Sequence, residues 1–177
     1  MKLLLAPFLL VAASILAGAY GAFHNQISYA VAPDYFHEFK FQQFVIPLEF
    51  HNRLGASWVG WNASWWMGSL VGVPILLICA FANGVGAFVR TYLLSAVIVL
   101  LVTLGIGLVA LAVSFVTISA DNLPSWSNGA ELNDPVAFAR AGTMHNFSYL
   151  GALLGMLAGF VVSIRAVIKS RVPTLNG

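Results

Sequence analysis

The sequence contains very few charged residues. Only 8% of its 177 residues are charged, while 60% are apolar, whereas soluble globular domains carry about 25% charged residues. A water-soluble fold of this length could not bury so much apolar surface, so lipid must cover part of the chain. The net charge of +2 is small and the lysines and arginines form no cluster, which argues against a nucleic-acid-binding surface.

Cysteine is almost absent as well. The sequence has one cysteine, Cys79, and one thiol cannot form an internal disulfide. The fold therefore does not depend on a framework of disulfides. Because Cys79 lies within an apolar run, a small residue in the core or against lipid is favoured over a reactive thiol.

Long apolar runs without charge dominate the rest of the sequence. Four of them reach the length of about 20 residues that is needed to cross the hydrocarbon core of a bilayer. They lie at about residues 3–23, 58–82, 92–118 and 147–168. We therefore expect an all-α membrane protein in which four transmembrane helices form a bundle, with residues 1–177 as a single domain.

The first apolar run has a second interpretation. It follows Lys2 and ends in the small residues Ala17-Gly18-Ala19, which also fits a secretory signal with a cleavage site. The run is long enough to span a bilayer, so a retained helix is the favoured interpretation.

The charged residues are distributed unevenly around the four spans. Those on the side of the termini are all basic: Lys2, Arg90, Arg165, Lys169 and Arg171. All six acidic residues lie in the segments 24–57 and 119–146 on the other side, with Lys40, Arg53 and Arg140. The positive-inside rule therefore predicts cytoplasmic termini. The two longer segments are then the outer segments, where recognition is expected.

The outer segments contain signals for helix starts. Residues 33–44 combine aromatic and charged side chains, which favours a short interfacial helix between the first and second spans, with a loop packed on the helix ends as the alternative. Asp134-Pro135 predicts that the fourth helix begins at Pro135. By the same pattern Pro47 predicts an early start of the second helix, in which Glu49 and Arg53 would form an i, i+4 ion pair.

Small residues recur every fourth position in two of the spans. One stripe consists of Gly60, Ser64, Gly68 and Gly72, and the other of Gly151, Gly155 and Gly159. Small residues allow the backbones of membrane helices to approach closely. The stripes predict that the second and fourth spans touch. The alternative is that one stripe faces another copy of the chain in a homo-oligomer.

All four histidines fall on the outer side. His24, His51 and His145 lie near the ends of three different spans. Together with Glu49 they suggest a possible site for zinc, copper or iron. No two of these residues have the spacing of a helical metal motif. The favoured interpretation is therefore that the histidines form ordinary hydrogen bonds at the membrane interface and do not bind a metal. Apart from this candidate metal site, the sequence predicts no cofactor.

The entry of the fourth span is unusually polar. His145, Ser148 and Tyr149 occupy neighbouring helical positions and are accompanied by Asn146, while Asn62 enters the second span at similar depth. Polar groups in lipid are costly unless they are paired. The patch is therefore either a hydrogen-bonded contact between helices or a small pocket for a ligand. Further ligand candidates on the outer face are Tyr35, Lys40 and Arg53.

Several motifs carry a resemblance to a group of proteins. They are found at 24–29 (HNQISY), 33–36 (PDYF), 39–44 (FKFQQF), 53–56 (RLGA), 65–68 (WWMG) and 144–151 (MHNFSYLG). The chain resembles small four-helix proteins of the bacterial inner membrane that are called hypothetical or signal-peptide-containing. The resemblance implies an inner-membrane location with a periplasmic outer face, and it implies no activity.

Three functions are compatible with these features. The favoured one is a non-catalytic accessory or binding protein, because no catalytic motif is present and the outer segments are aromatic. Its partners would be the lipid bilayer and either further copies of the chain or another membrane-protein subunit. The alternatives are a metal-dependent membrane protein that uses the outer histidines and a small oligomeric transporter, which the lack of charge within the spans disfavours.

Overall fold

The computed structural model describes residues 1–127 and 132–172, and in this part the chain forms helices joined by short connections. Four long helices are sufficiently long and apolar to cross a membrane. They are α1 (Lys2–Val31), α3 (Arg53–Cys79), α4 (Val85–Thr117) and α5 (Pro135–Arg171). These helices are those of a multi-pass membrane protein, as the apolar runs predicted.

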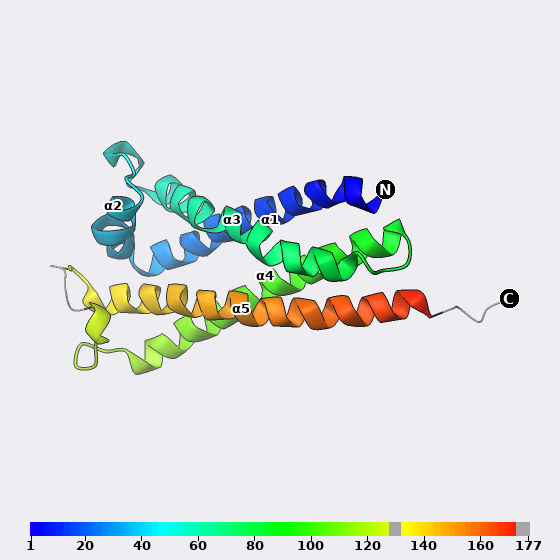
Figure 1. Ribbon diagram of the computed structural model, residues 1–177. Coiled ribbons are helices and arrows are strands. Elements are labelled where there is room, and N and C mark those ends of the chain that lie inside the picture. Colours follow the sequence, from blue (N-terminus) through cyan, green and yellow to red (C-terminus); the bar gives the residue numbers. More distant parts are fainter. Residues whose placement is uncertain (128–131, 173–177) are drawn as a thin grey trace.

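The long helices form two pairs that lie against each other (Figure 1). α1 packs along α3, and α4 packs along α5, while the contacts between the pairs are fewer. The start of α1, the turn between α3 and α4 and the end of α5 lie at one end of the bundle, the terminal end. The short elements η1 (Tyr35–Lys40), α2 (Phe41–Gln43), η2 (Leu48–Phe50) and η3 (Ser125–Ser127) lie at the other end, the loop end.

Small residues explain the close contact within the α1/α3 pair. A side chain at Gly60 of α3 would collide with the backbone carbonyl group of Gly21 in α1, and one at Gly68 would collide with that of Ala13. Between these two glycines, the side chain of Ser64 lies against Gly21. The stripe of α3 therefore faces α1, where small residues let the two backbones meet.

The α4/α5 pair is built in the same way. A Cβ atom at Gly155 of α5 would lie 2.8 Å from the carbonyl oxygen of Val99 in α4. One at Gly151 would lie 3.0 Å from the carbonyl oxygen of Thr103 in α4. The second stripe of small residues thus faces α4.

The second and fourth spans do touch, as α3 and α5, but the expectation that they meet along both stripes is wrong. Most of each stripe packs against the other helix of its own pair, while a Cβ atom at Gly72 would lie 2.5 Å from the hydroxyl of Tyr92 in α4 and one at Gly159 would lie 3.0 Å from Cδ1 of Ile75 in α3. The physical reason is that a small-xxx-small stripe marks a helix face that permits close approach but does not specify the helix that occupies it.

Capping side chains decide where two of the long helices begin. α5 begins at Pro135, and the Asp134 carboxylate accepts a hydrogen bond from the backbone N–H of Ala137 at 2.9 Å, which confirms the predicted start. The expectation for Pro47 is wrong, because this proline precedes only the single turn η2. α3 begins at Arg53, and Asn52 is its N-cap.

The Asn52 cap also explains why the expected Glu49–Arg53 ion pair does not form. The Asn52 side chain accepts hydrogen bonds from two backbone N–H groups of the first turn of α3, so the helix cannot extend back to Glu49. Glu49 lies in η2, outside the regular helix that an i, i+4 pair requires. Arg53 donates to Oε1 of Gln26 at 3.3 Å instead.

The connection between α1 and α3 is helical and packs on the helix ends. Phe36 and Phe41 are fully buried there, in one cluster with Ala56 and Val59 of α3 and Phe138 of α5. The segment is therefore helical and packed on the helix ends, and its location at a membrane interface stays a prediction. Its buried rings hold η1 and α2 against α3 and α5.

Candidate functional site

The site lies where α1 meets α5 near the loop end, and two reciprocal hydrogen bonds define it. Nε2 of His24 in α1 lies 3.0 Å from the hydroxyl of Ser148 in α5. Nε2 of His145 in α5 lies 3.1 Å from the hydroxyl of Ser28 in α1. The two imidazole rings are nearly perpendicular, with their centroids 4.6 Å apart. Each helix thus contributes one histidine and one serine to the same contact.

Asn25 extends this cluster to α3 and fixes the proton positions around His24. Its amide nitrogen donates to the carbonyl oxygen of Ala56 at 2.9 Å, so its oxygen Oδ1 is the atom that faces Nδ1 of His24 at 3.3 Å. Nδ1 must then carry the proton. A neutral imidazole has one donor and one acceptor, so the Ser148 hydroxyl shares its one proton between Nε2 of His24 and the carbonyl oxygen of Met144, which lies 2.9 Å away.

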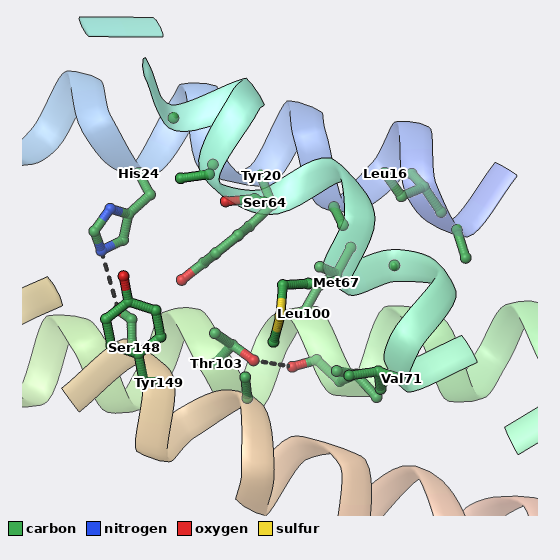
Figure 2. Close-up of a pocket in the computed structure, with 18 of the residues that line it drawn as sticks. Leu16, Tyr20, His24, Ser64, Met67, Val71, Leu100, Thr103, Ser148 and Tyr149 are labelled. Atoms are coloured by element: carbon green, nitrogen blue, oxygen red, sulfur yellow. Dashed lines mark hydrogen bonds between the residues drawn. The ribbon is translucent and has the colours of Figure 1, made fainter. Parts of the chain in front are cut away.

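A cavity of about 180 Å³, which we call the inter-pair cleft, lies between the two helix pairs beside this cluster. Side chains from all four long helices line it, as Figure 2 shows. Its polar end is formed by His24, Asn25, Lys40, Gln43, His145 and Ser148. Its interior is apolar and includes Ala17, Met67, Val71, Ala96, Leu100 and Ala152. The cleft is therefore amphipathic along the axis of the bundle.

Two tyrosine hydroxyls in the cleft are buried and have no hydrogen-bond partner among the residues that the structure describes. Tyr20 extends from α1 into the space between the helix pairs, and its hydroxyl points toward the α5 side (Figure 2). Tyr92 of α4 is only 1% exposed and lies deeper in the cleft. A buried hydroxyl without a partner costs about 1–3 kcal/mol, so the Tyr92 hydroxyl weakens the folded state.

Lys40 brings a positive charge to the polar end. Its ammonium group donates to Oε1 of Gln43 at 2.9 Å and lies 4.6 Å from the ring centroid of Phe39 and 5.6 Å from that of Tyr35. Burial lowers the pKa of the Lys40 ammonium group. The Lys40 side chain is half-buried and its hydrogen bond to Gln43 lies at the surface, so water also reaches the ammonium group.

The structure brings some of the ligand candidates together and leaves others apart. His145, Ser148, Tyr149 and Lys40 line the cleft, and the ring of Tyr35 lies 4.8 Å from that of His145. Three candidates lie elsewhere. Asn62 donates to the carbonyl oxygen of Trp58 in its own helix, Asn146 is exposed, and Arg53 contacts Gln26 outside the cleft.

The four candidate metal ligands do not form one group. His24 and His145 lie together, but His51 stacks on Phe41 with a centroid distance of 4.5 Å, and Glu49 is exposed in η2. Throughout residues 1–127 and 132–172, no three side chains of His, Cys, Asp or Glu are placed to hold a metal ion. The converging ends of α1 and α5 bring His24 and His145 together. His51 lies apart from them because it belongs to the connecting segment 44–52.

Several residues of the site carry only a weak signal in the sequence. Asn25 and Ser28 follow His24 on α1 and could have been found, because the i, i+4 spacing of His24 and Ser28 places both on one helical face. The sequence signal for Tyr92 is absent, since tyrosine near the end of a span is ordinary at a membrane interface. Only the packing of four helices shows that its hydroxyl is buried.

A scan against models of protein families found no match to this chain, and neither did searches of curated proteins and of solved structures. The assignment of the site therefore depends on the geometry of this chain and on general chemistry.

Proposed function

We propose that this protein is a non-catalytic membrane protein that binds an amphiphile dissolved in the bilayer. The apolar part of the ligand occupies the interior of the inter-pair cleft, and its headgroup lies at the polar end. The observation that carries this proposal is the combination of an apolar interior with a polar end in a single cavity among four apolar helices. Binding sites with this composition are typical of small-molecule pockets.

The dimensions of the cleft support an elongated ligand. On α1 the lining residues extend from Ala13 to Asn25, which corresponds to about 18 Å along the helix axis at a rise of about 1.5 Å per residue. A headgroup alone would leave most of this length empty. An alkyl or isoprenoid chain with a polar head matches both its length and its polarity.

The proposed location follows from the charges. The terminal end carries Lys2, Arg165 and Arg171, and the loop end carries acidic residues such as Asp34 and Asp134. The positive-inside rule supports cytoplasmic termini in a bacterial inner membrane. The polar end of the cleft then lies in the outer leaflet, on the periplasmic side.

Photo-crosslinking tests the proposal directly. The protein is reconstituted into phosphatidylcholine nanodiscs with hexadecanol that carries a diazirine in its chain, and peptide mass spectrometry maps the cross-links after illumination. We expect cross-links to cleft residues such as Met67 and Leu100. The Ala96→Phe variant fills the cleft from α4 and should reduce these cross-links at least tenfold.

The control for this experiment is the same substitution on the same helix outside the cleft. Ala112 is exposed on α4, so Ala112→Phe should leave the cleft cross-links unchanged. Both variants are compared by thermal unfolding to establish that they fold. Cross-links confined to outward-facing residues such as Leu101, with none in the cleft, would refute binding between the helix pairs.

A further inference from the structure

The charge of Lys40 is unmatched within the cleft. It is the one Lys, Arg, Asp or Glu side chain among the described residues that line the cavity. Its contacts are the neutral Gln43 side chain and two aromatic rings. The cavity therefore has a fixed positive charge at its polar end and no carboxylate beside it.

We infer, on the basis of the proposed function, that the cleft selects an anionic amphiphile, a single long chain whose carboxylate or phosphate head pairs with Lys40. The shared chemistry is an anionic oxygen headgroup. A charge-assisted hydrogen bond from the ammonium group is shorter and stronger than one between neutral groups. Neutral amphiphiles would leave the charge of Lys40 unpaired.

The position of Lys40 is fixed well enough for selective binding. It belongs to η1, and Phe36 of the same turn and Phe41 directly after it are fully buried against α3 and α5. These two anchors hold the backbone of η1 in place. The ammonium group is thus presented to the cleft by an ordered segment, which reduces the entropy lost on binding.

The other polar groups of the cleft lie around the same point. The ring of Tyr35 contacts both Lys40, at 5.6 Å, and the ring of His145, at 4.8 Å. His145 in turn contacts His24, the partner of Ser148. A headgroup beside Lys40 would therefore lie next to the imidazole rings of this cluster.

Partial burial of the Lys40 side chain favours an anionic partner. The pKa of Lys40 is lowered by burial, which means that the protein without a ligand disfavours its charged form. A bound anion would reverse this effect because it supplies the opposite charge at short range. The basic residues nearest in the chain are engaged elsewhere, since Arg53 donates to Gln26 and Arg140 donates to the carbonyl oxygen of Ile118.

Three probes with the same diazirine-labelled chain test this inference in phosphatidylcholine nanodiscs at pH 8: hexadecanoic acid, hexadecyl phosphate and hexadecanol. We expect at least one anionic probe to label the cleft tenfold more efficiently than the alcohol. In the Lys40→Gln variant, labelling of the cleft by that probe should fall to the level seen with the alcohol. The Lys40→Arg variant should retain most of the labelling.

Arg53→Gln is the matched control, because it removes a basic residue of the loop end that lies outside the cleft, and it should leave the preference for the anion unchanged. Preference for the acid alone identifies a carboxylate ligand, and preference for the phosphate ester alone identifies a phosphate ligand. The inference would be overturned if all three probes label the cleft equally and Lys40→Gln, shown to unfold at the same temperature as the parent protein, has no effect on labelling. The proposed function would remain intact in that case. Failure of every probe to label the cleft would overturn both.

Discussion

At the scale of single residues, two histidine–serine pairs join α1 to α5, and Figure 2 shows the pair of His24 and Ser148. Their geometry requires both helices to keep one register, since a shift of one residue on either helix would separate both pairs at once. Hydrogen bonds between membrane helices contribute about 0.6 kcal/mol on average and up to about 1.7 kcal/mol. Buried groups that lose their partner cost more.

Ser148→Ala removes the donor to Nε2 of His24 and should lower the free energy of unfolding by about 1–2 kcal/mol. Thermal or denaturant unfolding in detergent micelles measures this change. Ser119→Ala, at an exposed position of the loop end, is the control and should change the stability by less than about 0.5 kcal/mol. Equal stabilities of the two variants would contradict a structural role for the reciprocal pairs.

Tyr92→Phe should have the opposite sign. Its hydroxyl is buried and without a partner within residues 1–127 and 132–172, so its removal eliminates a desolvation cost and should stabilise the protein by about 1 kcal/mol or more. Tyr149 is 64% exposed, and Tyr149→Phe should be close to neutral. A loss of stability in Tyr92→Phe would show that the hydroxyl has a partner in the folded protein.

At the scale of elements, the close contacts of α1 with α3 and of α4 with α5 define two rigid helix pairs, and the cleft lies between them (Figure 1). The contacts between the two pairs are fewer than those within each pair. The glycine stripes therefore help to determine where the cleft can form.

Gly155→Leu introduces a side chain where the Cβ atom alone would lie 2.8 Å from the carbonyl oxygen of Val99. The helices of the α4/α5 pair must separate, and we expect a destabilisation of about 2–3 kcal/mol. Gly105→Leu places the same side chain on α4 with no neighbouring atom within 4 Å and should be neutral or slightly stabilising because leucine favours helix. Thermal unfolding of both variants in micelles compares them, and equal unfolding temperatures would contradict this packing.

At the scale of the whole molecule, both ends of the bundle are fastened by polar contacts. At the terminal end the Lys2 ammonium group donates to the carbonyl oxygens of Ala80 and Ala82, and Arg171 donates to that of Phe81 at 2.8 Å. These cations satisfy carbonyl groups at the end of α3, where positive charge is favourable. At the loop end, the Asp34 carboxylate accepts from the backbone N–H groups of Asn133 and Asp134.

In the proposed orientation, a reagent outside the cell membrane reaches the loop end of the bundle but not the terminal end. In a Cys79→Ala background, Glu38→Cys at the loop end should react with a membrane-impermeant maleimide added to intact spheroplasts. Asn83→Cys, in the turn between α3 and α4, should react only after the membrane is permeabilised. Both native residues are exposed, so burial does not confound the comparison. The reverse pattern would place the termini outside.

The sequence by itself determined that this chain forms four long apolar helices and that α5 begins at Pro135. Both are properties of short stretches of chain, because hydropathy measures how each residue interacts with lipid or water, and a cap such as Asp134 acts within one helical turn. Charge patterning and polar residues near His145 also pointed to the end of the bundle where the site lies.

Only the tertiary structure decided which glycine stripe meets which helix, and that His24 and His145 exchange hydrogen bonds with Ser148 and Ser28 while His51 stays apart. It also decided that Lys40 reaches a cavity formed by four different helices. These outcomes depend on how whole helices pack against one another. Several pairings satisfy the same hydropathy, and the pattern within any one span does not distinguish among them.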